Sequence, residues 1–168
     1  MTHADNTVKA LETERYKCMQ DVMKIAKTLL KEDGSHMPIL FMFHKDKNYV
    51  IPMEFTEDNK MEQMRKMRLA AKKTGARACL LITEAWVASF ESDETSDEQA
   101  FIEGQVPVRD HPNKREALSM SWEIKLDNEI IKGVELLHFH RDNDGTVITD
   151  KTVRSIDSFQ GNMIGILS

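Results

Sequence analysis

The stretch at residues 77–90 constrains the fold more than any other part of the sequence. Its first half, ACLLI at 78–82, is apolar at every position, and its second half contains Glu84-Ala85-Trp86. A short apolar run rich in aliphatic residues is typical of a buried β-strand. Because the first half has no polar face, we expect a central strand in a sheet that is covered on at least one side.

Two stretches show apolar residues at helical spacing. The first covers about residues 7–32 and ends at Gly34, and the second covers about residues 59–74 and ends at Gly75. Glycine is the residue that most readily takes the left-handed conformation found just past a helix end. The sequence therefore predicts two main helices, preceded by residues 1–6, which we expect to be disordered.

Short apolar or alternating runs, separated by turn-forming residues, predict the remaining strands. These runs are residues 37–43, 49–53, 117–126, 130–141 and 147–153. Strands group at both ends of the predicted order, and only two long helices accompany them. The predicted fold class is therefore α+β, with a mostly antiparallel sheet of five to six strands and the two main helices on one face.

The composition is that of a single folded domain spanning residues 1–168. The chain is 40% hydrophobic and 30% charged, which suits a globular protein with an adequate core. Residues 91–106 are acidic and rich in turn formers, so we expect them to form a mobile loop. That loop could also serve as a partner-binding surface.

The net charge of -5 argues against nucleic acid as a partner, since non-specific binding to nucleic acid needs a clustered basic face. Basic residues do concentrate between residues 60 and 77, where they could touch phosphates. The commoner meaning of such a run is a solvated helix face.

No segment of the chain has the character of a signal-peptide core, and no apolar run approaches the roughly 20 residues of a membrane helix. We therefore expect a cytoplasmic protein without membrane contact. Cys18 and Cys79 lie in unrelated contexts, and we expect small buried hydrophobes rather than a disulfide or a nucleophile.

His138 and His140 point to the same face of the strand predicted at 130–141. With Asp142 nearby, two imidazoles could hold zinc or iron if a third protein ligand joined them. The candidates for that ligand are His111, Glu123 and His44. The alternative is an ordinary polar strand face that approaches a turn.

We expect no cofactor, with a divalent metal bound by His138, His140 and Asp142 as the open alternative. The residues after His140 lack the serine and aspartate of the zinc-dependent JAB/MPN isopeptidases, so that activity is not expected.

Asp110 followed by Glu123-Ile124-Lys125 resembles the sparse signature of the PD-(D/E)xK nucleases. The resemblance implies two carboxylates that hold Mg²⁺ and a lysine that helps to orient the attacking water. In that family a helix soon follows the motif strand, whereas another strand is predicted here. The exposed face of a half-buried strand explains the pattern equally well.

A third pattern predicts a binding rim at one edge of the sheet. The residues of this rim are Trp86, Arg109, Asp110, His111, Arg115 and Glu116. Arg115 offers a planar donor fork to a carboxylate or phosphate. The alternative is a structural ion pair, with Glu84 or Glu116 as the partner of Arg115, that fixes the entry to a strand.

The pattern over residues 77–126 also resembles small bacterial and phage proteins of unassigned function. It consists of a strand that ends in Glu-Ala-Trp and a loop with Pro and Arg-Glu-Ala-Leu that leads into a strand. The resemblance implies that Trp86, Arg115 and Glu116 lie together, and it implies no activity.

No complete catalytic motif is present, because the sequence lacks a P-loop, a Gly-x-Gly-x-x-Gly turn and a Gly-x-Ser-x-Gly elbow. The leading hypothesis is a non-catalytic binding or accessory protein that acts through a protein partner or as an oligomer. The second hypothesis is a metal-dependent hydrolase that uses His138, His140 and Asp142. A nuclease that uses Asp110, Glu123 and Lys125 is the third. Whether the protein is an enzyme stays open at this point.

Overall fold

The computed structural model describes residues 2–56, 58–88, 114–127, 129–156 and 166–167. In chain order the elements are α1 (His3–Leu11), α2 (Glu14–Asp33), β1 (Ile39–Phe43), β2 (Asn48–Pro52), α3 (Lys60–Thr74), β3 (Ala78–Ala88), β4 (Lys114–Lys125), β5 (Ile130–Arg141) and β6 (Val147–Ile156). Residues 91–106, predicted to form an acidic loop, lie outside the described residues. No helix in the described part is long and apolar enough to cross a membrane.

The six strands form one sheet in the order β2-β1-β3-β4-β5-β6. Every neighbouring pair is antiparallel. The apolar run at 78–82 lies in β3, which is an interior strand and pairs along its whole length with β4. The predicted α+β class and the antiparallel sheet are therefore confirmed.

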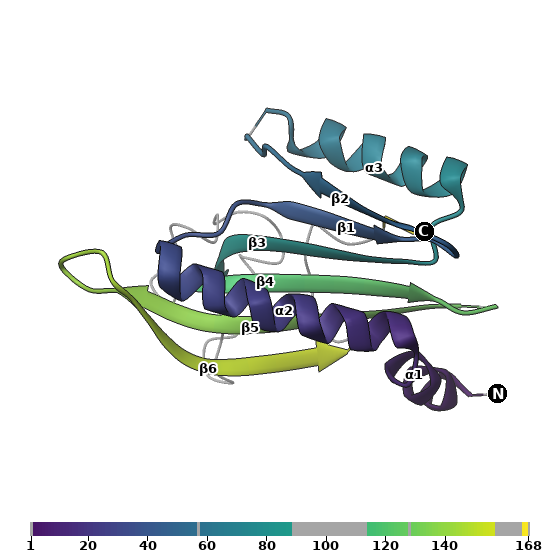
Figure 1. Ribbon diagram of the computed structural model, residues 1–168, viewed down its shortest axis with the longest axis horizontal. Coiled ribbons are helices and arrows are strands. Elements are labelled where there is room, and N and C mark those ends of the chain that lie inside the picture. Colours follow the sequence, from purple (N-terminus) through teal and green to yellow (C-terminus); the bar gives the residue numbers. More distant parts are fainter. Residues whose placement is uncertain (1, 57, 89–113, 128, 157–165, 168) are drawn as a thin grey trace, which may run out of the picture.

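The two main helices pack on opposite faces of this sheet, because successive side chains of a strand point to opposite sides. Leu80 of β3 belongs to the apolar cluster that contains Met23 of α2, and Figure 1 shows α2 lying across this face. Leu81 of β3 belongs to a separate cluster with Met64 of α3. The prediction that both helices share one face is wrong. An apolar run without a polar face needs cover on both sides, and helical periodicity does not say which side each helix covers.

The first predicted helix is in fact two helices, because Thr13 ends one and caps the next. The Thr13 hydroxyl donates to the carbonyl of Ala10 at 2.7 Å and accepts the backbone N–H of Tyr16 at 3.2 Å. A threonine in this role satisfies one of the free N–H groups at a helix start. The Tyr16 ring then packs edge-on against Trp122 of β4, with ring centroids 5.2 Å apart, and fixes α2 on the sheet.

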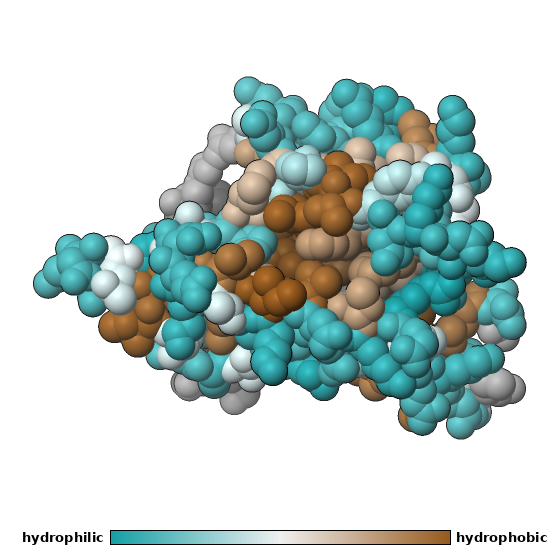
Figure 2. All heavy atoms as spheres, in the orientation of Figure 1, coloured by the Kyte–Doolittle hydropathy of each residue, from teal (hydrophilic) through white to brown (hydrophobic). Residues whose placement is uncertain are grey.

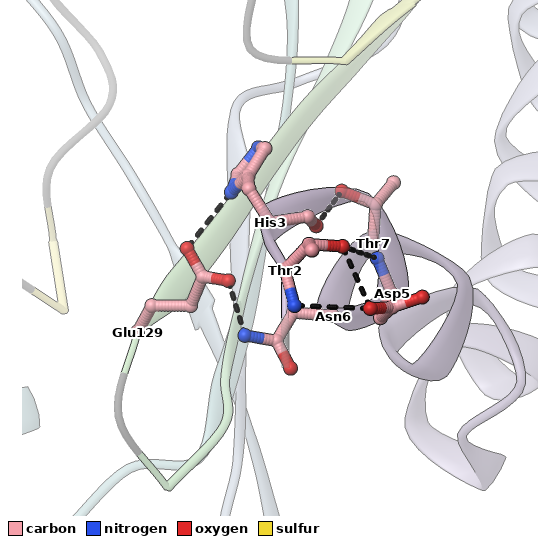
Figure 3. A network of polar contacts seen from close by, with 6 residues as sticks. All are labelled: Thr2, His3, Asp5, Asn6, Thr7 and Glu129. Carbon is pink, nitrogen blue, oxygen red and sulfur yellow. Dashed lines mark hydrogen bonds and ion pairs between the residues drawn. The ribbon is translucent and has the colours of Figure 1, made fainter.

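Residues 1–6 were expected to be disordered; residue 1 lies outside the described residues, and residues 3–6 form the start of α1. Thr2 and Asp5 form a capping box in which each side chain bonds the backbone of the other. Figure 3 shows that α1 is also tied to the turn between β4 and β5. Glu129 bonds His3 Nδ1 at 2.8 Å and the side-chain amide of Asn6. The hydrogen bond with His3, and after it the one with Asn6, lower the pKa of the Glu129 carboxyl. The same two contacts attach the start of α1 to the sheet.

Candidate functional site

One end of the sheet carries a pocket of about 350 Å³ where β3 ends and β4 begins. We call it the rim pocket. Its lining residues are Trp86, Lys114, Arg115, Glu116, His138, Phe139, His140 and Asp150. Two sequence patterns that are far apart in the chain, the Trp86 rim and the histidine pair, therefore meet in one place.

Strand register explains this meeting. Trp86 lies opposite Glu116 in the β3–β4 pair, and Glu116 lies opposite Phe139 in the β4–β5 pair. Residues directly opposite each other in antiparallel strands share a face and are close neighbours. Trp86, Arg115 and Glu116 all line the rim pocket, although Arg115, the neighbour of Glu116 in β4, points to the opposite face of the strand. The other three rim residues, 109–111, lie outside the part of the chain that the structure describes.

His138 is buried at a bulge in β5, since the β5–β6 register shifts between Leu137 and Phe139. Burial lowers the pKa of His138, and the positive charges of Arg115 and Lys151 lower it further. Its Nδ1 atom has no hydrogen-bond partner among the described residues. His138 therefore lies in the pocket as a neutral imidazole near neutral pH.

The proposed metal ligands come together only in part. His140 is exposed, and its Nδ1 lies 3.5 Å from Asp150, which also lines the rim pocket. Asp142 belongs instead to the turn after β5, where its carboxylate accepts the backbone N–H groups of Asp144 and Thr146.

No three His, Cys, Asp or Glu side chains within the described ranges are grouped so that they could hold a metal ion. Of the three candidate third ligands, His44 follows β1 at the other end of the sheet. Glu123 lies eight residues along β4 from Arg115, and His111 is outside the described residues. The metal site therefore stays a prediction.

Glu123, the central residue of the nuclease-like pattern, ties the end of the chain to the sheet. Its carboxylate is 2% exposed and accepts the backbone N–H of Ile166 at 2.8 Å and the thiol of Cys79 at 3.3 Å. Burial first, and then the charge of Glu123, raise the pKa of that thiol, so Cys79 is not an activated nucleophile. Lys125 is exposed at the end of β4, and β5 follows without an intervening helix.

The structural ion pair expected at the rim exists, but Arg141 forms it rather than Arg115. The Arg141 guanidinium donates to Glu84, to Glu116 at 2.6 Å and to the carbonyl of Gly34 at 3.1 Å. It therefore connects the end of α2 with β3, β4 and β5. Arg115 is exposed and lies opposite Val87. Sequence spacing missed Arg141 because the three contacts depend on strand register.

The α2 side of the sheet carries an apolar surface beside the helix, over β1 and β2. Figure 2 shows hydrophobic side chains gathered on this face, next to α2. Phe41 of β1 is half-buried, and Val50, its neighbour on β2, is 58% exposed. On α2, Ile25 is 59% exposed and Leu29 is 39% exposed. We call these four residues the apolar strip.

The family model of bacteriophage lambda protein ea47 matches residues 3–160, from the start of α1 to beyond the end of β6. The chain belongs to this family. The match agrees with the phage part of the resemblance seen over residues 77–126. No curated protein and no solved structure matches the chain. Membership in the family brings no activity with it, so function has to be argued from the surface of the molecule.

Proposed function

We propose that the protein is a non-catalytic binding or accessory protein, and that it binds a partner protein through the apolar strip. The observation that carries the proposal is the exposure of apolar side chains on the α2 side of the sheet. Contiguous apolar surface of this kind is uncommon on proteins that act alone, and it marks interaction sites.

Exposure rises steadily from the centre of the sheet to its edge along one row of side chains. Leu80 of β3 is fully buried, Phe41 of β1 is half-buried and Val50 of β2 is 58% exposed. All three share the α2 face because they are register neighbours. The row therefore becomes more exposed toward β2, the edge strand of the sheet.

The side of α2 that faces β1 completes the strip. Lys27 lies on the opposite flank of the helix, where it reaches Glu135 of β5 at 2.5 Å. At 3.6 residues per turn, Ile25 and Leu29 project from the other flank, toward β1 and β2. One wall and the floor of the strip are thus apolar.

The dimensions of the strip favour a helix as its occupant. Two strands span about 10 Å across a sheet, since neighbouring strands are about 4.8 Å apart. Packed helices lie about 8–10 Å from one another, so one further helix fits beside α2. An amphipathic helix of a partner protein would cover Phe41 and Val50 and contact Ile25 and Leu29, as in other helix-in-groove complexes.

A second copy of this chain fits the strip less well. The outward surface of α2 is polar, with Asp21, Lys24, Thr28 and Lys31 exposed. A copy that laid α2 across the strip of its neighbour would bury these groups without partners, which costs free energy. Self-association is therefore the other outcome of the test.

Two matched variants test the proposal. Ile25→Glu places a charge in the strip, and Thr28→Glu places the same charge on the polar side of α2. Tagged wild type and both variants are purified from native cells, and light scattering gives the mass of each. We expect the same bound protein with wild type and Thr28→Glu, and its loss with Ile25→Glu. Equal recovery in all three samples would overturn the proposal. A dimer that only Ile25→Glu dissociates would replace the partner by a second copy.

A further inference from the structure

A second pocket, of about 360 Å³, lies at the opposite end of the sheet from the rim pocket, between the β1–β2 turn and the end of α3. Its lining residues are His44, Lys45, Asp46, Lys47, Tyr49, Thr74, Gly75 and Arg77. We call it the basic pocket. Its volume is within the usual range for pockets that bind small molecules.

Positive charge exceeds negative charge in the basic pocket. Lys45, Lys47 and Arg77 stand against the single carboxylate of Asp46. Within the described part of the chain, these three cations form no ion pair with an acidic residue. Lys47 Nζ lies 5.3 Å from the centre of the Tyr49 ring.

Lys72 and Lys73 lie in the last turn of α3, just before Thr74 and Gly75 of the pocket lining. Basic residues at this position commonly balance the negative end of a helix dipole, which is equivalent to about half an elementary charge. Lys72 and Lys73 together already exceed that requirement. The cations of the pocket come from other elements, the β1–β2 turn and the start of β3, so the helix dipole does not explain them.

The side chain of His44 shows how the pocket holds its polar groups. The Thr74 hydroxyl donates its only proton to the carbonyl of Ala70 at 2.7 Å. Thr74 Oγ1 must therefore accept the proton of His44 Nε2 across the 2.6 Å contact. His44 Nδ1 is then left buried, with no partner among the residues described.

We infer that the basic pocket binds a phosphate group. Arg77 supplies a planar donor fork that suits phosphate oxygens, while Lys45 and Lys47 supply point charges. The phosphate could be free or could belong to a nucleic acid strand. Tyr49 is 39% exposed, and its ring contacts Lys47 and His44 within the pocket.

The net charge of the whole chain hides this concentration. Residues 60–77 contain seven basic residues and one acidic residue, whereas residues 89–113 contain seven acidic residues and one basic residue. A net charge of -5 is therefore compatible with a local cationic surface, which is the electrostatic feature that phosphate binding requires.

The experiment compares wild type with two triple variants of equal charge. K45A/K47A/R77A removes the cations of the basic pocket, and K9A/K24A/K31A removes three exposed lysines from α1 and α2. Two probes separate the sources of phosphate: inorganic phosphate, judged by the melting temperature against chloride at equal ionic strength, and a fluorescent oligothymidylate, judged by anisotropy at several salt concentrations.

For inorganic phosphate, we expect it to raise the melting temperature of wild type and of K9A/K24A/K31A, but not of K45A/K47A/R77A. For the oligonucleotide, we expect at least a tenfold loss of affinity in K45A/K47A/R77A alone, with a smaller salt dependence. Each phosphate contact with a single strand contributes about 0.7 to the slope of log K against log salt, so the slope should fall by about 2.

A response to either probe that depends on the basic pocket supports the inference and identifies the source. No response to both probes, or an equal loss in both triple variants, overturns it. If K45A/K47A/R77A melts well below wild type without ligand, Arg77→Gln replaces it. Among the described residues, the exposed side chain of Arg77 forms no hydrogen bond or ion pair, and the same outcomes then decide.

Discussion

Gly133 of β5 lies directly opposite Trp122 of β4, and the indole ring fills the space that a side chain at position 133 would need. A Cβ built on Gly133 would be 2.2 Å from Trp122 Cζ2. Trp122 is 1% exposed and in turn contacts Tyr16 of α2. The glycine that interrupts the apolar pattern of β5 is therefore what allows α2 to dock on the sheet.

Gly133→Ala should destabilise the protein by about 2 kcal/mol or more, because overpacking of a filled core forces side chains and backbone to shift. Urea unfolding followed by tryptophan fluorescence measures the change. The second substitution Trp122→Leu should recover part of the loss, giving a favourable coupling in a double-mutant cycle. Additive effects of the two substitutions would show that the ring and position 133 do not compete for space.

Arg141→Gln should cost about 1–3 kcal/mol, since charge-assisted hydrogen bonds to Glu84 and Glu116 are lost together with the bond to Gly34. Arg141→Lys should recover little, because an ammonium group cannot reproduce three bonds in a planar fork. The matched control is Arg115→Gln, an exposed residue one strand away, which should change stability by less than about 0.5 kcal/mol. Equal costs at 115 and 141 would contradict the assignment of the rim ion pair to Arg141.

His138 should make the stability of the protein depend on pH on the acid side of neutrality. Its pKa in the folded protein lies below the ordinary value of 6.5, chiefly because burial disfavours the cation. The unfolded chain then binds more protons than the folded chain between these two pKa values, so stability falls as pH drops from about 7 through this window.

Urea unfolding from pH 4.5 to 8 tests this dependence. His138→Gln should flatten the curve, while His140→Gln, at an exposed position, should leave it unchanged. A wild-type curve that rises as pH falls through 6.5 would mean that His138 is charged in the folded protein.

Removal of metal ions distinguishes a metal site in the rim pocket from an ordinary polar strand face. Because Asp142 is engaged in the turn and no three His, Cys, Asp or Glu side chains of the described residues are grouped so that they could hold a metal ion, we expect EDTA to leave the melting temperature unchanged. Elemental analysis of the untreated protein provides the control. Stoichiometric zinc, iron or manganese, together with a lower melting temperature after EDTA, would restore the hydrolase hypothesis.

Much of the sheet follows from the sequence because strand periodicity is a local property. The run at 130–141 predicts the first and the last residue of β5 correctly. The run at 78–82 predicts that β3 is an interior strand, as it is. The break at Thr13 is hidden because apolar spacing continues from α1 into α2, while a hydroxyl that bonds its neighbours ends the helix.

Sites are harder to predict than strands, because they depend on register and on which face each helix covers. Arg115 and Arg141 are equally basic in sequence, and only the pairing of β3, β4 and β5 places Arg141 between two carboxylates. Likewise, the run at 49–53 predicts a strand but not how far its side chains are exposed. Val50 lies on the edge strand β2, on the α2 face, and is 58% exposed.

Site-specific photo-crosslinking from the apolar strip tests the central claim most directly. A benzophenone amino acid replaces Leu29, on the flank of α2 that faces β1, and in a matched sample replaces Thr28, on its polar side. After irradiation in native cells, we predict an adduct with one partner protein from position 29 only, mapped to an amphipathic helix and abolished by Val50→Asp. Adducts of equal yield from positions 28 and 29, or none from position 29, would contradict the account.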